Sequence, residues 1–249
     1  MSKNSHNRVT QTSKRWLISA LLLFSMNASA LSNSTSSTNI ELHPYEAVYT
    51  AYKWGDDVGE AHIKLEALNN QQYSLTYSSK VSKFFLSDKR YEHSIFTVED
   101  GALLPIEYHY NRTGTGPDKK LTVNFNSVKG GKITVENGDE FSWDGQFDNQ
   151  LYRVDLAKQL ALGKTSLRYN FINYRGQLRS YGVKVVATED LSLPYGELET
   201  IKVKLIRDSK KRETYAWFAP SLNYALVRLQ QFKDGKEQGD IKLKSYVTE

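Results

Sequence analysis

The chain has 249 residues and no cysteine, which excludes disulfide bonds, thiolate metal sites and a lipid anchor on an N-terminal cysteine. Its formal charge of +5 falls to +1 without residues 1–30, which hold four Lys and Arg and no acidic residue. The basic pI therefore comes partly from the N-terminus and does not indicate nucleic-acid binding.

Residues 1–30 have the three-part pattern of a secretory signal peptide. Four basic residues in the first 15 positions precede an apolar run at 16–24, and Ala28 and Ala30 supply the small residues of a cleavage site. The apolar run is too short to cross a bilayer, which takes about 20 residues. We predict cleavage after Ala30, a periplasmic protein and no transmembrane anchor in the mature chain.

The mature chain is predicted to form one β-rich domain. Residues 31–44 are mostly small and polar and are expected to form a flexible tether. From residue 45 to residue 249, apolar and polar residues alternate with the period of two that is typical of strands, and turn pairs such as Asn137-Gly138 separate the runs. The predicted strands are 45–53, 58–67, 72–82, 90–98, 103–111, 119–127, 131–136, 165–174, 178–189, 197–207, 212–218, 224–233 and 239–247.

A single segment breaks the β pattern and predicts a helix at 149–162. Asp148 is the candidate N-cap and Gly163 the candidate stop. Tyr152, Leu156 and Leu160 fall on one face, and the opposite face is also apolar. A helix that is apolar on two sides is expected to be buried. The predicted fold is therefore all-β, with a curved antiparallel sheet forming a partly closed barrel or β-spiral around one buried helix.

The sequence contains few features that indicate catalysis. No G-x-S-x-G, H-E-x-x-H, Walker A or complete G-x-G-x-x-G motif is present. His93 and His109 lie on neighbouring predicted strands, but no third ligand stands at a suitable spacing for a metal. We therefore expect no catalytic residue, no metal site and no cofactor, and a protein that is not an enzyme.

Aromatic residues are the most suggestive feature of the mature chain. All sixteen tyrosines follow residue 44, and Tyr and Trp suit both ligand cavities and ordinary β-strands. The residues predicted to line a ligand cavity are Tyr152, Leu156, Leu160 and Trp217.

Five short motifs in order make the chain resemble the bacterial family of exported proteins called domain of unknown function 3108. They are Tyr45 and Tyr49 followed by Gly59-Glu60-Ala61; Leu104-Pro105 before Tyr108-His109-Tyr110; Asp148 with Leu151-Tyr152, Leu160 and Gly163; residues 194–200, PYGELET; and Trp217-Phe218-Ala219 with Tyr224 and residues 227–229. The resemblance implies an envelope protein of unassigned activity with a curved antiparallel sheet.

Three functions remain open at this point. The leading one is a non-enzymatic periplasmic envelope protein that binds a lipid-like ligand in a half-barrel cavity. The second is an adaptor that binds an envelope protein through its sheet edges. The third, a glycan hydrolase, requires a cleft with convergent carboxylates of shifted pKa. The lipid-binding function requires a cavity of at least about 300 Å³ between the helix and the sheet.

Overall fold

The computed structural model describes residues 42–69, 71–136, 138–207, 209 and 211–248, which all belong to one of the two units of the chain, Thr38–Glu249. The signal peptide predicted at 1–30 and the first part of the predicted tether lie outside the described residues. The strands are β1 (Tyr45–Lys53), β2 (Asp56–Ala67), β3 (Gln72–Lys83), β4 (Leu86–Glu99), β5 (Ala102–Gly114), β6 (Lys119–Phe125), β7 (Lys132–Val135), β8 (Glu140–Ser142), β9 (Ser166–Ile172), β10 (Leu178–Leu193), β11 (Gly196–Ile206), β12 (Arg212–Ala219), β13 (Ala225–Lys233) and β14 (Lys236–Thr248).

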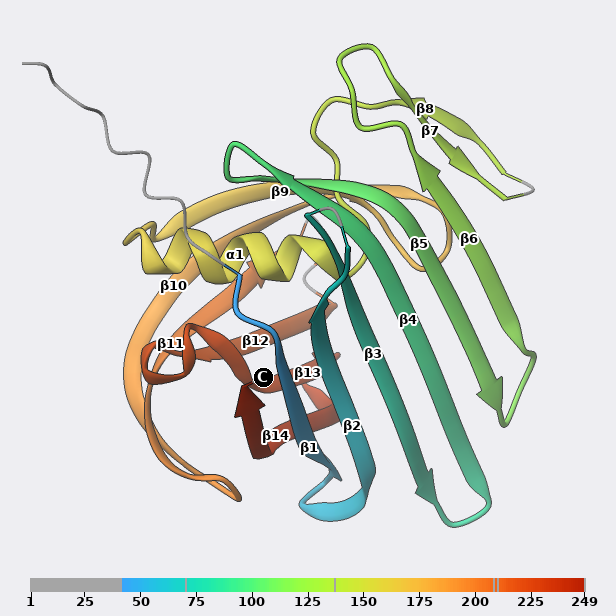
Figure 1. Cartoon of the computed structure of the whole chain (residues 1–249). Coiled ribbons are helices and arrows are strands. Elements are labelled where there is room, and N and C mark those ends of the chain that lie inside the picture. The colour runs from blue at the N-terminus through green and yellow to red at the C-terminus, as the bar shows by residue number, and fades with distance from the viewer. Residues whose placement is uncertain (1–41, 70, 137, 208, 210, 249) are drawn as a thin grey trace, which may run out of the picture. The chain divides into compact units, whose positions relative to one another are not determined.

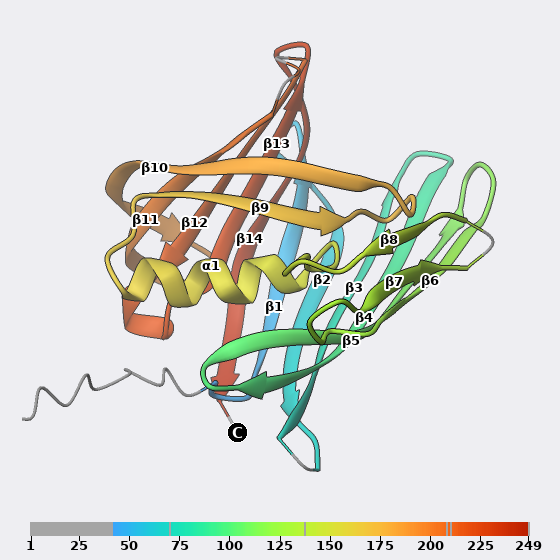
Figure 2. The same cartoon turned by 90° about the horizontal axis from the view of Figure 1, so that it is seen from above.

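These strands form one antiparallel sheet in the order β8-β7-β6-β5-β4-β3-β2-β1-β14-β13-β12-β11-β10-β9. The end strands β8 and β9 do not pair with each other, so the sheet is not closed. Register shifts interrupt six of the strand pairs, and such bulges bend and twist a sheet. The sheet accordingly curves, with its two halves facing each other across α1 (Figures 1 and 2).

The predicted β-rich class and antiparallel sheet are confirmed, and most strand positions agree with the prediction. The strand β8 was not predicted, because its three residues are too few to show an alternating pattern. Within the residues that the structure describes, no helix is long and apolar enough to cross a membrane.

The helix α1 (Leu151–Ala161) lies within the predicted range of 149–162. Asp148 was predicted as the N-cap, but the N-cap residue of α1 is Gln150. The Asp148 carboxylate still serves the helix start, because its Oδ1 accepts hydrogen bonds from the backbone N–H groups of Gln150 and Leu151, each at 2.8 Å. This satisfies two donors that a helix start leaves without intrahelical partners.

Burial of α1 is uneven. Leu151, Tyr152, Leu156 and Leu160 are buried in the main core, whereas Ala161 is exposed and Leu162, just beyond the helix, is 43% exposed. The prediction of burial on two sides is therefore not confirmed, because the buried residues gather on the face that packs on the sheet.

The core has two parts. The main cluster joins α1 to residues of β1–β5 and β9–β14. A second cluster gathers residues of β5, β6 and β7 with Ile172 at the end of β9. Far ends of the sheet thus meet through side chains, although their backbones do not pair.

Candidate functional site

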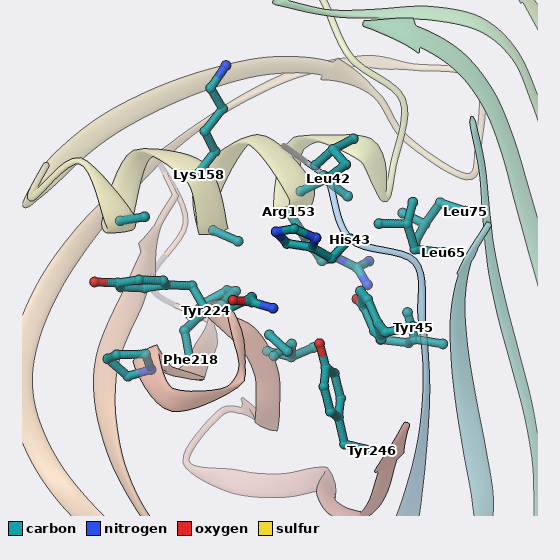
Figure 3. A pocket seen from close by; sticks show the side chains of 18 of the residues that line it. Leu42, His43, Tyr45, Leu65, Leu75, Arg153, Lys158, Phe218, Tyr224 and Tyr246 are labelled. Carbon is teal, nitrogen blue, oxygen red and sulfur yellow. The ribbon is translucent and has the colours of Figure 1, made fainter. Parts of the chain in front are cut away.

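A cavity of about 520 Å³ opens between α1, the residues before β1 and the connection from β12 to β13. Its position within the bend of the sheet is shown in Figure 3. The lining residues are Leu42, His43, Tyr45, Ile63, Leu65, Leu75, Gln150, Arg153, Val154, Ala157, Lys158, Ala161, Leu162, Phe218, Pro220, Asn223, Tyr224, Ala225, Leu226 and Tyr246. Its volume exceeds the lower range for ligand sites, so the expectation of a cavity between helix and sheet is confirmed.

The walls of this cavity follow from the local periodicity of the elements. On α1 the lining residues Val154, Ala157 and Ala161 recur at spacings of three and four, so they share one helical face. On β2, Ile63 and Leu65 alternate with outward-facing Lys64 and therefore point inward. The result is a largely aliphatic wall with small residues on the helix side.

Arg153 is the main charged group that reaches into this apolar space. It extends from α1 toward Tyr45 (Figure 3). Its Nη2 donates to the Asn149 carbonyl oxygen at 3.2 Å, and its guanidinium lies 5.7 Å from the centroid of the Tyr152 ring. Burial disfavours its charged form, but Tyr152 and Glu92 raise the pKa of Arg153 above its ordinary value. Glu92 is therefore the acidic group whose charge acts on Arg153, but within the described residues no salt bridge joins the two side chains.

Tyrosines at the floor of the cavity cannot neutralise this charge. Tyr45 and Tyr246 line the cavity and stack with ring centroids 5.2 Å apart. Tyr49 lies behind them in the core, and its hydroxyl donates to the Leu226 carbonyl oxygen at 2.7 Å. Burial raises the pKa of Tyr45 and of Tyr49, so both phenols remain protonated at neutral pH. These tyrosines are therefore neutral, and the cavity is lined by the cationic side chains of Arg153 and Lys158.

A buried polar network fixes the start of α1 beside the cavity. The Gln150 side-chain amide donates to the Leu75 carbonyl oxygen at 2.7 Å and to Ser94 Oγ at 2.9 Å. Asp148 is fully buried, and its Oδ2 has no hydrogen-bond partner. Burial raises the pKa of Asp148 to about 6, because the charged carboxylate is poorly solvated there.

The four predicted lining residues are placed elsewhere. Tyr152, Leu156 and Leu160 are buried in the main core on the sheet-facing side of α1, and Trp217 is 2% exposed on β12. None of them is among the cavity-lining residues. The neighbouring positions Arg153, Val154 and Ala157 line the cavity instead. Their spacing places them close together on the helix, but it does not indicate that this side of the helix meets the cavity.

The two histidines singled out by the sequence do lie together. His93 and His109 face each other directly across β4 and β5. The His93 Nδ1 lies 2.9 Å from Thr76 Oγ1, and His109 Nε2 lies 2.8 Å from Glu107 Oε1. In the described ranges, no group of three or more His, Asp or Glu side chains is arranged to hold a metal ion.

The fold and the cavity together define a class: proteins with a single open, curved antiparallel sheet that holds one helix in its bend and leaves an apolar cavity beside that helix. Residues 45–242 match the family model described as "Protein of unknown function (DUF3108)". The chain belongs to this family, as the sequence motifs predicted.

One solved structure shows a similar fold. A beta-barrel-like protein of the domain of unknown function DUF1849 from Brucella abortus is similar with a TM-score of 0.59 and 8% identity, over 84% of this chain and 99% of the other. This likeness concerns the fold alone.

Two further structures are more distant. A "putative exported protein with YmcC-like fold" from Bacteroides fragilis has a TM-score of 0.34 and 13% identity, over 83% of this chain and 97% of the other. A "putative lipoprotein" from Parabacteroides distasonis has a TM-score of 0.33 and 11% identity, over 83% of this chain and 96% of the other. Comparison with curated proteins gives no match.

Proposed function

We propose that the protein is a non-enzymatic periplasmic envelope protein whose cavity binds a lipid-like molecule with an anionic head group. The observation that carries this proposal is the combination of a 520 Å³, mostly apolar cavity with the charge of Arg153, which forms no salt bridge within the described residues. The periplasmic location rests on the signal-peptide pattern of residues 1–30.

The energetics of such a ligand are favourable. Each methylene buried against walls such as Leu65, Leu75 and Leu226 contributes about 0.8 kcal/mol. A hydrogen bond between a charged head group and Arg153 adds about 1.5–3 kcal/mol. Ten buried methylenes would therefore outweigh moderate costs of immobilisation.

The finer description of the fold belongs to the same proposal. We infer that the sheet acts as a partly closed half-barrel, with α1 as the wall that completes the cavity. Contacts of Ile172 on β9 with the cluster on β5–β7 support this inference, because they draw the two ends of the sheet together.

The adaptor alternative has less in its favour. Along the outer edge of β9, Phe147 already occupies two backbone hydrogen-bonding groups: its N–H donates to the Asn170 carbonyl oxygen at 3.0 Å, and its carbonyl oxygen accepts from the Ile172 N–H at 2.9 Å. The opposite edge strand, β8, has only three residues. Short or covered edges are poor templates for an added strand.

The hydrolase alternative requires two accessible carboxylates, and the neighbouring pair Glu92 and Asp148 is the candidate for them. Glu92 Oε2 accepts hydrogen bonds from the Tyr108 hydroxyl and the Asn149 amide, each at 2.7 Å, and its charge contributes to the raised pKa of Asp148. Glu92 is only 6% exposed and Asp148 is fully buried, and neither lines the cavity. A glycan has no access to them, so we do not propose hydrolysis.

Binding of a fluorescent fatty acid, followed by displacement with unlabelled ligands, tests the proposal. The wild-type protein should bind a long-chain fatty acid more tightly than the fatty alcohol of equal length. Arg153→Gln should remove this preference, a loss of about tenfold or more for the acid, and leave the alcohol unaffected. Lys158→Gln is the matched control, since Lys158 also lines the cavity but donates to the Gly101 carbonyl oxygen. A wild-type protein that binds neither ligand contradicts the proposal.

A further inference from the structure

Large apolar side chains are exposed at two hairpin turns. Trp54 lies in the turn between β1 and β2 and is 64% exposed. Phe84 and Phe85 form the turn between β3 and β4 and are 88% and 100% exposed, and Leu86 beside them is 62% exposed. These four residues are named the aromatic tip below.

The two turns lie side by side, at the lower end of the strands in Figure 1. Lys83 connects them: its Nζ lies 4.7 Å from the centroid of the Trp54 ring and donates to the Lys53 carbonyl oxygen at 3.1 Å and to Asp56 Oδ2 at 2.9 Å. The aromatic tip is therefore one surface and not two unrelated turns.

Packing within the protein does not explain why these exposed positions carry large apolar side chains. Trp54 and Phe84 have φ angles of +56° and +55°, a region that favours glycine and asparagine over bulky residues. Because the rings are exposed, they recover little of this conformational cost by burial in the protein. A surface that is costly both in backbone conformation and in hydration indicates an apolar partner.

Basic residues surround the aromatic tip. Residues 53–57, 80–90 and 112–120, at the turns from β1 to β2, β3 to β4 and β5 to β6, hold eight Lys and Arg against four Asp. Three of these basic residues form ion pairs: Lys83 with Asp56, and Arg90 and Arg112 with Asp88. The remaining Lys residues leave a net positive charge around the tip. Lys80 and Lys89 are both exposed and lie directly opposite each other on β3 and β4, an arrangement of like charges that is unfavourable in isolation. An anionic partner would relieve this repulsion.

We propose that the aromatic tip docks on the surface of a bilayer that contains anionic lipid. Trp and Phe side chains enter the boundary between head groups and acyl chains, and Lys and Arg near the surface each add about 1 kcal/mol with anionic lipid, or about fivefold in affinity. The arrangement here, apolar side chains at the extremity with a ring of cations behind them, matches both requirements.

This surface is separate from the cavity. Tyr45, which lines the cavity, begins β1, whereas Trp54 follows the other end of the same strand. Failure of one proposal therefore leaves the other intact.

Flotation of the protein with vesicles of phosphatidylethanolamine and phosphatidylglycerol tests the proposal. The double variant Phe84→Ser/Phe85→Ser should bind at least about tenfold more weakly for each ring removed. Lys80→Gln/Lys89→Gln should bind less tightly to these vesicles and should not change binding to phosphatidylcholine vesicles. Val128→Ser is the control, because Val128 is 59% exposed but lies beyond the opposite end of β6. All variants carry the same N-terminus, so any contribution from residues 1–41 cancels.

Quenching by lipids with brominated acyl chains locates the contact. Tryptophan fluorescence should be quenched in the wild type, and the loss should be absent in Trp54→Phe, which keeps an aromatic ring but removes the reporter. The proposal is overturned if the wild type does not float with the vesicles, if Phe84→Ser/Phe85→Ser floats as well as the wild type, or if Trp54→Phe is quenched equally.

Discussion

The two ends of the hairpins β1–β2 and β3–β4 use apolar residues in opposite ways. At the end beside α1, Leu65 and Leu75 are 2% and 4% exposed, and Tyr49 in the middle of β1 is fully buried. At the other end, Trp54 and Phe85 are 64% and 100% exposed. The strands and the residue types are alike at both ends.

The difference lies in what covers the strands. Beside the cavity, α1 and the β12–β14 half of the sheet pack against β1–β3, and the turns at the far end extend beyond this covering (Figures 1 and 2). An aromatic residue is therefore part of the core at one end and available to a partner at the other. Three variants test this contrast.

Leu156→Ala should have the largest effect, because it opens a hole where α1 packs on the sheet. Leu156 is 1% exposed, and truncation of such a residue costs about 2–5 kcal/mol of unfolding free energy. Urea denaturation measures this change. The matched control is Val154→Ala on the cavity side of α1, which should cost about 1 kcal/mol or less because its neighbours already border empty space. Equal losses for the two variants would show that the cavity is not open in solution.

Asp148→Asn should change the dependence of stability on pH. The folded pKa of about 6 lies above the ordinary value of 3.8, so the folded state binds the proton more tightly than the unfolded state does. Asp148 therefore favours folding at low pH, and this contribution is lost as the pH rises from about 4 to about 6.

Asparagine retains the acceptor for the N–H groups of Gln150 and Leu151 and carries no charge. Relative to the wild type, the variant should gain up to about 3 kcal/mol between pH 4 and pH 6. Urea denaturation at a series of pH values measures the difference between the two proteins. A constant difference across this range would mean that Asp148 titrates normally in the folded protein.

Phe84→Gly should have the smallest effect on stability, and its sign should be opposite to that of Leu156→Ala. Glycine adopts the φ of +55° without strain and loses no buried surface, so the unfolding free energy should stay the same or rise by up to about 1 kcal/mol. Thermal and urea unfolding measure it. A clear loss of stability would mean that the exposed ring has a structural role and would weaken the contrast between the two ends.

Sequence patterns were enough to predict most of the secondary structure and the family. Period-two alternation predicted the strands because a half-buried strand must place every second residue on the core side. The break in that pattern predicted α1 to within two residues at its start. Gly59, part of a motif shared with the family, has a local reason: its φ is +141°, and a Cβ there would lie 2.1 Å from the Lys80 carbonyl oxygen.

Only the tertiary structure decided which apolar residues form the core, the cavity or the aromatic tip. Tyr152 and Leu156 were predicted to line a cavity, yet the adjacent positions Arg153 and Ala157 do so, because a helix with two apolar faces does not reveal which of them meets the sheet. The exposure of Phe84 and Phe85 was equally hidden, since it depends on where α1 and the opposite half of the sheet end. Local periodicity specifies the direction of a side chain within its own element, and long-range packing specifies what that side chain meets.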